Sequence, residues 1–215
     1  MKILAFAIGR FVLLISLVGI TCFFVRGIAH GAEERPLTRP ICFLGLCAKQ
    51  DRNFFETLKA FERMHGRGAA AADWARCYVE PKTGRFLRLG LSDPVQYAAK
   101  KNVGAVITEL FLTDVKNCTS ANSIKGFPEP ALLNGLGIGD ALDSVIEHFG
   151  KPSARTEYVP KGFFASQNAV ESTREDRAFG DAQLLYRATN PNDSLALRIF
   201  LRGNRVSGIL LSLSP

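Results

Sequence analysis

The stretch GDALDSVIEHFGKP, residues 139–152, carries the strongest structural signal in this chain. Its apolar residues recur at i, i+3, i+4 and i+7, on one face of a helix: Leu142, Val145, Ile146 and Phe149. Asp140 is suited to cap this helix, and Asp143 stands in its first turn, where a carboxylate is favoured. Gly150 can take the left-handed conformation that ends a helix, and Pro152 prevents its continuation. The stretch therefore predicts a short amphipathic helix.

Strands are expected after this helix. Runs rich in apolar and β-branched residues, bounded by Gly, Pro, Asn and Asp, predict them at 155–159, 181–188, 194–201 and 205–213. The turn at 202–204 contains Gly and Asn, so the last two strands should form a hairpin. Residues 165–180 are polar, charged and too numerous for a hairpin turn, which indicates a surface loop.

The first half also begins with a helix and continues with strands. The helix is expected to begin at Asp51 and to end at Gly66 or Gly68. Its apolar face follows the i, i+4, i+7 spacing: Phe54, Leu58 and Phe61. Residues 74–91 read as a hairpin with its turn at 81–84, and residues 103–115 are apolar on both faces, as in a buried strand. The linker at 117–130, rich in Ser, Asn, Gly and Pro, suggests a boundary.

The N-terminal segment, residues 1–32, has the pattern of a signal peptide. Lys2 and Arg10 precede an uncharged apolar run at 11–25, and small residues follow at 29–32. The alternative is an uncleaved membrane anchor, since residues 3–25 reach spanning length if Arg10 is tolerated. Either way the protein is expected in the periplasm, secreted, or anchored in the inner membrane facing the periplasm. Without three basic residues of this segment, the net charge of +7 becomes 24 minus 20, or +4.

Four cysteines remain after the signal segment, and all lie before residue 120: Cys42, Cys47, Cys77 and Cys118. An even number of cysteines in an exported chain predicts two disulfides, with three connectivities open. A metal site is not expected, because the spacing lacks a second ligand pair and the mature chain has only His65 and His148.

The glycine, inner valine and Gly-x-Pro of the quoted helix, at Gly139, Val145 and 150–152, resemble a known pattern. Residues 136–213 look like the small modules of BamE-like (SmpA/OmlA-type) envelope lipoproteins and of β-lactamase-inhibitor-protein-like secreted proteins. The resemblance implies short helices packed on one face of an antiparallel sheet, whose other face binds a protein partner. We therefore expect an α+β fold with an extended leader at 33–50, a disulfide-bearing module at 51–118 and a second module at 131–215, and leave two tandem similar modules open.

Catalytic signals are weak. The 22% charged and 47% hydrophobic content excludes a disordered or collagen-like chain, and the single long apolar run excludes a polytopic membrane protein. His148 has no nucleophile motif beside it, and a structural role is favoured. The glycines at 135, 137 and 139 lack the spacing of a dinucleotide fingerprint. We expect no cofactor and no nucleic-acid partner.

Aromatic residues around the polar loop are the candidate binding site. Phe163 and Phe164 follow Pro-Lys-Gly at 160–162, where a paired aromatic can anchor an interface or cover the sheet core. Tyr158 and Phe179 flank the same loop. The predicted function is an exported, non-enzymatic protein-binding module: an inhibitor, an immunity protein or an envelope-assembly accessory. The alternatives are an exported enzyme of unrecognised type and a membrane-anchored structural subunit.

Overall fold

The structure is a computed structural model, and it describes residue 37 and residues 41–48, 54–92, 104–126, 133–158, 176–188 and 195–213. The chain separates into two compact units, Met1–Glu33 and Glu34–Pro215, and every described residue belongs to the second. The signal-peptide prediction therefore falls outside the described residues.

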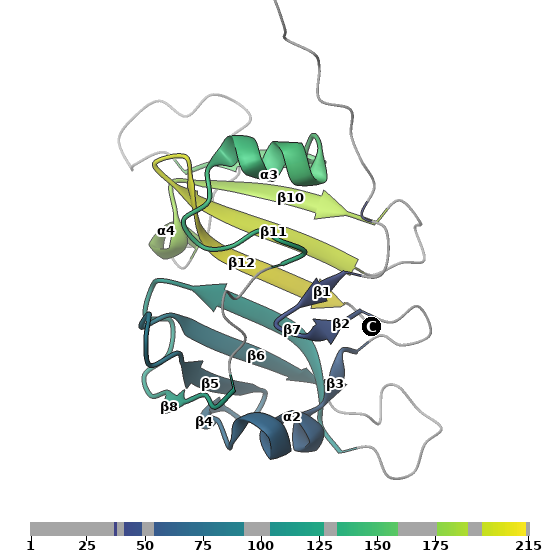
Figure 1. Cartoon of the computed structure of the whole chain (residues 1–215), viewed down its shortest axis with the longest axis vertical. Coiled ribbons are helices and arrows are strands. Elements are labelled where there is room, and N and C mark those ends of the chain that lie inside the picture. The colour runs from purple at the N-terminus through teal and green to yellow at the C-terminus, as the bar shows by residue number, and fades with distance from the viewer. Residues whose placement is uncertain are drawn as a thin grey trace, which may run out of the picture. The chain divides into compact units, whose positions relative to one another are not determined.

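A ten-stranded sheet dominates the described part of the chain (Figure 1). Its main path runs β4-β5-β6-β7-β12-β11-β10-β9, with β3 added on β7 and β8 on β5. Every pair along this path is antiparallel, and β8 pairs with β5 in parallel. The strands are β3 (Glu56–Thr57), β4 (Ala69–Ala72), β5 (Ala75–Val79), β6 (Phe86–Ser92), β7 (Val106–Thr113), β8 (Asn122–Ser123), β9 (Ala154–Glu157), β10 (Ala182–Arg187), β11 (Leu195–Arg202) and β12 (Arg205–Leu213). A separate hairpin joins β1 (Cys42–Phe43) to β2 (Leu46–Cys47).

Two helices cover one face of this sheet. They are α2 (Leu58–His65) and α3 (Leu142–Phe149), and a single turn, α4 (Asp176–Phe179), comes later. Phe61 of α2 and Val145 and Phe149 of α3 are buried in one core cluster with strand residues such as Leu110 and Ile209. This cluster, the main core, fills the helix-covered face.

The predicted α+β fold class is wrong. The described part of the chain is mainly antiparallel sheet, and its two longer helices have eight residues each. Strands β7, β11 and β12 have eight or nine residues, and much of the main core comes from their alternating apolar side chains. The sheet is also continuous across the two halves of the sequence, because β7 pairs with β12. Both helices are shorter than the average of about 10–14 residues, so the sheet decides the fold class.

The first helix begins later than predicted. It begins at Leu58, and Thr57 caps it by accepting a hydrogen bond from the Ala60 amide at 3.2 Å. The preceding residues are extended because they bond to β7: the Phe55 amide donates to the Ile107 carbonyl at 2.9 Å, and β3 pairs with Val106 and Ile107. Sheet pairing thus overrides the helical periodicity of Phe54.

The second helix follows the sequence more closely. Gly150 ends it with a φ of 74°, and its amide donates to the Ile146 carbonyl at 2.8 Å. The cap assigned to Asp140 is wrong: Ala141 is the N-cap residue, and Asp140 Oδ2 accepts instead from the Gly137 amide at 2.8 Å. The four strands that follow this helix and the hairpin turn at 202–204 lie within two residues of their predicted positions, whereas the strand predicted at 103–115 is shorter and spans Val106–Thr113.

Candidate functional site

The face of the sheet opposite the main core, here called the second face, carries its own apolar cluster. Side chains alternate along a strand, so Phe111 of β7 points away from its neighbours Leu110 and Leu112, which lie in the main core. Phe111 packs with Phe200 of β11 and Leu210 of β12, and the half-buried side chains of Tyr158 and Phe179 lie against them. The register places Phe111 directly beside Leu210.

Three rings make up an aromatic cluster on this face: Phe111, Phe179 and Phe200. The Phe111 and Phe179 rings meet edge to face at 4.7 Å between centroids, and the other two centroid distances are 5.5 and 5.6 Å. Gly208 of β12 lies beneath them, and a Cβ there would come within 3.2 Å of both Phe111 and Phe200. The glycine therefore gives the two strand rings room to approach each other.

Helix α4 forms one wall above the cluster. Ser207 Oγ donates to the Phe179 carbonyl, and Arg202 Nη2 donates to the Ala178 carbonyl at 3.2 Å. Gly180 lies so close to β11 that a Cβ would collide with the Leu201 carbonyl oxygen. These contacts fix Phe179 over the sheet, although α4 is only one turn long.

The loop after β7 forms the opposite wall. The disulfide between Cys77 and Cys118 joins this loop to β5, and Cys77 is paired in register with Arg88 of β6. Asn117 Oδ1 lies 3.4 Å from Cys118 Sγ. This is a van der Waals contact and not a hydrogen bond, because a disulfide sulfur has no hydrogen to donate. The disulfide therefore holds Asn117 and Cys118 beside the second face.

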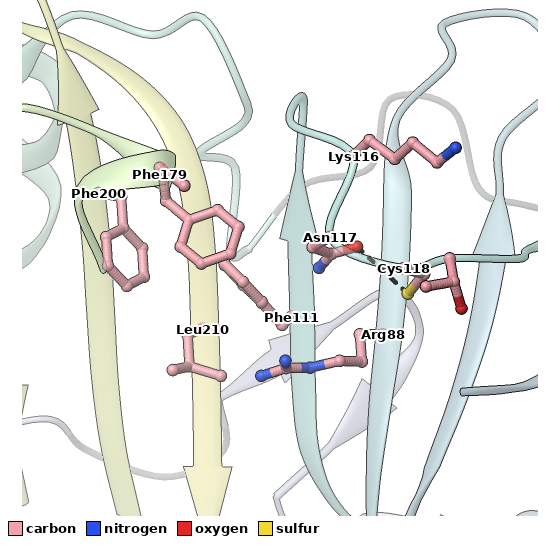
Figure 2. A pocket seen from close by; sticks show the side chains of 10 residues that line it. Arg88, Phe111, Lys116, Asn117, Cys118, Phe179, Phe200 and Leu210 are labelled. Carbon is pink, nitrogen blue, oxygen red and sulfur yellow. Dashed lines mark hydrogen bonds between the residues drawn. The ribbon is translucent and has the colours of Figure 1, made fainter. Parts of the chain in front are cut away.

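A cavity of about 660 Å³ lies between these two walls. Figure 2 shows Phe179, Phe200 and Leu210 on one side of it and Lys116, Asn117 and Cys118 on the other. Its lining is Arg88, Phe111, Lys116, Asn117, Cys118, Thr119, Ala178, Phe179, Phe200 and Leu210. This size is within the range of pockets that hold small ligands or single anchoring side chains.

Polar donors line the same cavity. Arg88 is 26% exposed, its Nη2 donates to Glu109 Oε1 at 3.1 Å, and its guanidinium carbon lies 5.4 Å from the centre of the Phe111 ring. Its Nε is buried and has no hydrogen-bond acceptor within the described part of the chain. The Asn117 side-chain nitrogen is buried without an acceptor in the same way. Buried donors are normally paired, so these two stand out.

The predicted partner-binding residues divide into two groups. Phe179 lines the cavity, and Tyr158 packs against the apolar cluster while its hydroxyl donates to Gln183 Oε1 at 2.7 Å. Phe163 and Phe164 lie outside the described residues. Sequence reasoning missed Arg88, Phe111 and Phe200, because a run such as 106–113 with apolar residues on both faces does not reveal which side chains face the second cluster.

The cysteines pair as Cys42–Cys47 and Cys77–Cys118, which confirms two disulfides and selects one of the three connectivities. Disulfides persist in oxidising compartments, so a location outside the cytoplasm is indicated. Among the described residues, none of the helices has the length and apolar character needed to cross a bilayer.

A second hollow, of about 540 Å³, lies beside α3. Its lining includes Asp140, Ser144, Glu147 and His148, of which the last three are exposed. Ser144 and His148 are four residues apart on one helix face. No hydrogen bond joins His148 to Ser144 or Asp140 in the described part of the chain, and the His148 ring contacts Phe149 at 4.8 Å.

Comparison with family models, with curated proteins and with solved structures finds no match to this chain.

Proposed function

We propose that this chain is an exported, non-enzymatic binding protein that recognises a partner protein through the second face of its sheet. The observation that carries the proposal is the cavity between α4 and the Cys118 loop, with an aromatic cluster on one side and cationic side chains at its edge. Aromatic and arginine side chains dominate the binding energy of protein interfaces. A protein in the periplasm or secreted to the medium would present this face to other envelope or extracellular proteins.

The resemblance to BamE-like and β-lactamase-inhibitor-protein-like modules supports the same proposal. The helix that carries the shared pattern is formed, with Val145 on its buried face and Gly150 at its end. Antiparallel strands follow that helix, and their far face carries Phe200 and Leu210. An inhibitor, an immunity protein or an envelope-assembly accessory would each use such a face.

Affinity capture with two matched charge reversals tests the proposal. Lys116 is exposed and lines the cavity, whereas Lys125 is also exposed and is outside the lining. We expect Lys116→Glu to lower the amount of partner recovered from an envelope fraction. Lys125→Glu should recover as much partner as the unsubstituted chain. Equal recovery with both variants would remove the second face as the binding surface.

A hydrolytic activity is the second candidate, and the hollow around His148 favours it. It gathers a hydroxyl, an imidazole and carboxylates, the groups from which nucleophilic sites are built. If this candidate holds, His148→Ala should abolish turnover of ester substrates by the purified chain and leave partner capture unchanged. Turnover that survives the substitution would exclude His148 as its base.

A further inference from the structure

We propose that the second-face cavity binds an apolar side chain that has a carboxylate beside it. This inference rests on the proposed function, because it names the chemical group by which a partner protein would enter the site. The cavity combines an apolar part, a polar part and a small positive charge.

The apolar part is the wall formed by α4 and the strands beneath it. Phe179 is half-buried, and Leu210 is 8% exposed, whereas Phe111 and Phe200 are almost fully covered. An entering side chain would therefore contact the Phe179 ring and the edge of Leu210. A ring or a branched aliphatic group gains most from such a contact, because buried apolar area and edge-to-face packing both contribute.

The polar part is a pair of buried donors, Arg88 Nε and the Asn117 amide nitrogen, that have no acceptor among the described residues. The guanidinium of Arg88 has five N–H groups, and Glu109 accepts a hydrogen bond from Nη2. The Asn117 amide belongs to the same lining, in the wall formed by the loop after β7. A carboxylate has two oxygens that accept hydrogen bonds and suits donors at separate positions.

The charge balance favours a single negative charge on the ligand. Arg88 and Lys116 contribute two positive charges, and Glu109 beside Arg88 contributes one negative charge. Asp114, two residues before Lys116, pairs with Arg202 at 3.7 Å, so these two charges cancel. The two cations of the lining, taken with the ion-pair partner of Arg88, carry a net charge of about +1, which matches one carboxylate better than a doubly charged phosphate.

Two positions in a partner chain supply this chemistry. One is a C-terminal apolar residue with its free carboxylate, and the other is an internal apolar residue preceded by Asp or Glu. Both place a carboxylate next to an apolar side chain, and small peptides distinguish them. N-acetylphenylalanine represents the first, and N-acetyl-aspartyl-phenylalanine amide represents the second.

Titration of the purified, disulfide-bonded chain with these probes, followed by NMR, tests the inference. N-acetylphenylalanine should bind with a Kd of about 1 mM, the strength expected for a ligand of its size. The largest shift changes should fall on Phe179, Gly208 and Asn117. N-acetylphenylalanine amide, which has the ring without the charge, should bind at least about tenfold more weakly, because hydrogen bonds to charged groups are the stronger ones. The aspartyl peptide amide will bind as tightly as N-acetylphenylalanine if an internal site is accepted, and as weakly as the neutral amide if a free C-terminus is required.

Three variants separate a binding role from a structural one. Arg88→Gln should weaken N-acetylphenylalanine binding about tenfold, and Glu109→Gln should tighten it about threefold, because a repelling carboxylate is removed. Arg198→Gln is the matched control, since Arg198 is exposed, lies beside Leu210 in register and is outside the cavity lining. If Arg88 and Glu109 had a purely structural role, Arg88→Gln and Glu109→Gln would weaken N-acetylphenylalanine binding to the same extent.

Equal binding of the acid and its amide would overturn the inference, as would the absence of shift changes at the cavity. Unchanged binding by Arg88→Gln would also overturn it. These results are distinct from a failure of the proposed function, which shows as equal partner capture by Lys116→Glu and Lys125→Glu.

Discussion

The Cys77–Cys118 disulfide should contribute far more stability than Cys42–Cys47. The first closes a loop with a sequence separation of 41 and the second a loop with a separation of 5. A cross-link stabilises mainly by restricting the unfolded chain, and the cost of its loss grows with the logarithm of loop length. That relation gives about 3.9 kcal/mol for Cys77–Cys118 and about 2.1 kcal/mol for Cys42–Cys47 at 25 °C.

Burial increases this difference. Cys77 is fully buried on β5, and Cys118 is 7% exposed, so their replacement also disturbs packing at the wall of the cavity. Cys42 and Cys47 face each other in a two-stranded hairpin and are both half-buried. The loop-length estimate of about 2 kcal/mol is therefore a lower bound on the difference between the two bridges.

Urea unfolding of two double-alanine variants measures the effect. Cys77→Ala with Cys118→Ala should lower the free energy of unfolding by about 4 kcal/mol relative to the unsubstituted chain, and Cys42→Ala with Cys47→Ala by about 2 kcal/mol. Intrinsic fluorescence and far-UV circular dichroism should report the same transition if unfolding is two-state. Equal losses, or a larger loss in the Cys42 and Cys47 variant, would refute the assignment of stability to the longer loop.

Three further predictions concern a close approach, a buried hydroxyl and the loop aromatics. Gly180→Ala should cost about 1–3 kcal/mol in urea unfolding, because the added Cβ meets the Leu201 carbonyl oxygen. Burial raises the pKa of Tyr78 to about 12, with the Glu62 carboxylate adding to the shift. Since the folded pKa exceeds the unfolded value near 10, the contribution of the neutral Tyr78 hydroxyl to the free energy of unfolding is complete below pH 10 and is lost as the pH rises towards 12. Tyr78→Phe should therefore flatten the decline of stability between these pH values. Replacing Phe163 and Phe164 together by Ala should weaken partner capture without lowering the unfolding midpoint.

Each of these three changes has a result that would contradict it, and the Gly180 change also has a matched control. Gly104→Ala is matched to the Gly180 change, because a Cβ at Gly104 would meet no atom of the described residues within 4 Å. Equal stability of the two variants would contradict the close approach. Identical pH profiles for the unsubstituted chain and Tyr78→Phe would contradict the burial argument. Unchanged capture after the Phe163 and Phe164 substitutions would remove those residues from the binding surface.

Local elements were predictable from the sequence wherever a local interaction decides them. The helix at 142–149 has its apolar face and its glycine end within nine residues, and the hairpin at 202–204 depends on Gly203 and Asn204, both at positive φ. The start of the first helix was not predictable in this way. Phe54 fits a helical period, but the following Phe55 bonds to Ile107, which is distant in the chain.

The candidate site was only partly predictable. Phe179 and Tyr158 could be selected because they flank a polar stretch of the sequence, and both lie at the second-face cluster. Arg88 could not be selected, since its importance comes from the cross-strand neighbours Cys77 and Phe111. A strand residue acquires its surroundings from register, and register was not visible in the separate strand patterns.

The sequence by itself determined the position of the helix at 142–149, the longer strands and the presence of disulfide-forming cysteines, because capping, periodicity and cysteine number are local or compositional properties. The tertiary structure decided that β7 pairs with β12 to join both halves in one sheet, and that Cys77 pairs with Cys118. It also decided which apolar side chains face the helices and which form the second cluster. These outcomes depend on contacts between residues far apart in the chain, whose free energies no single segment contains.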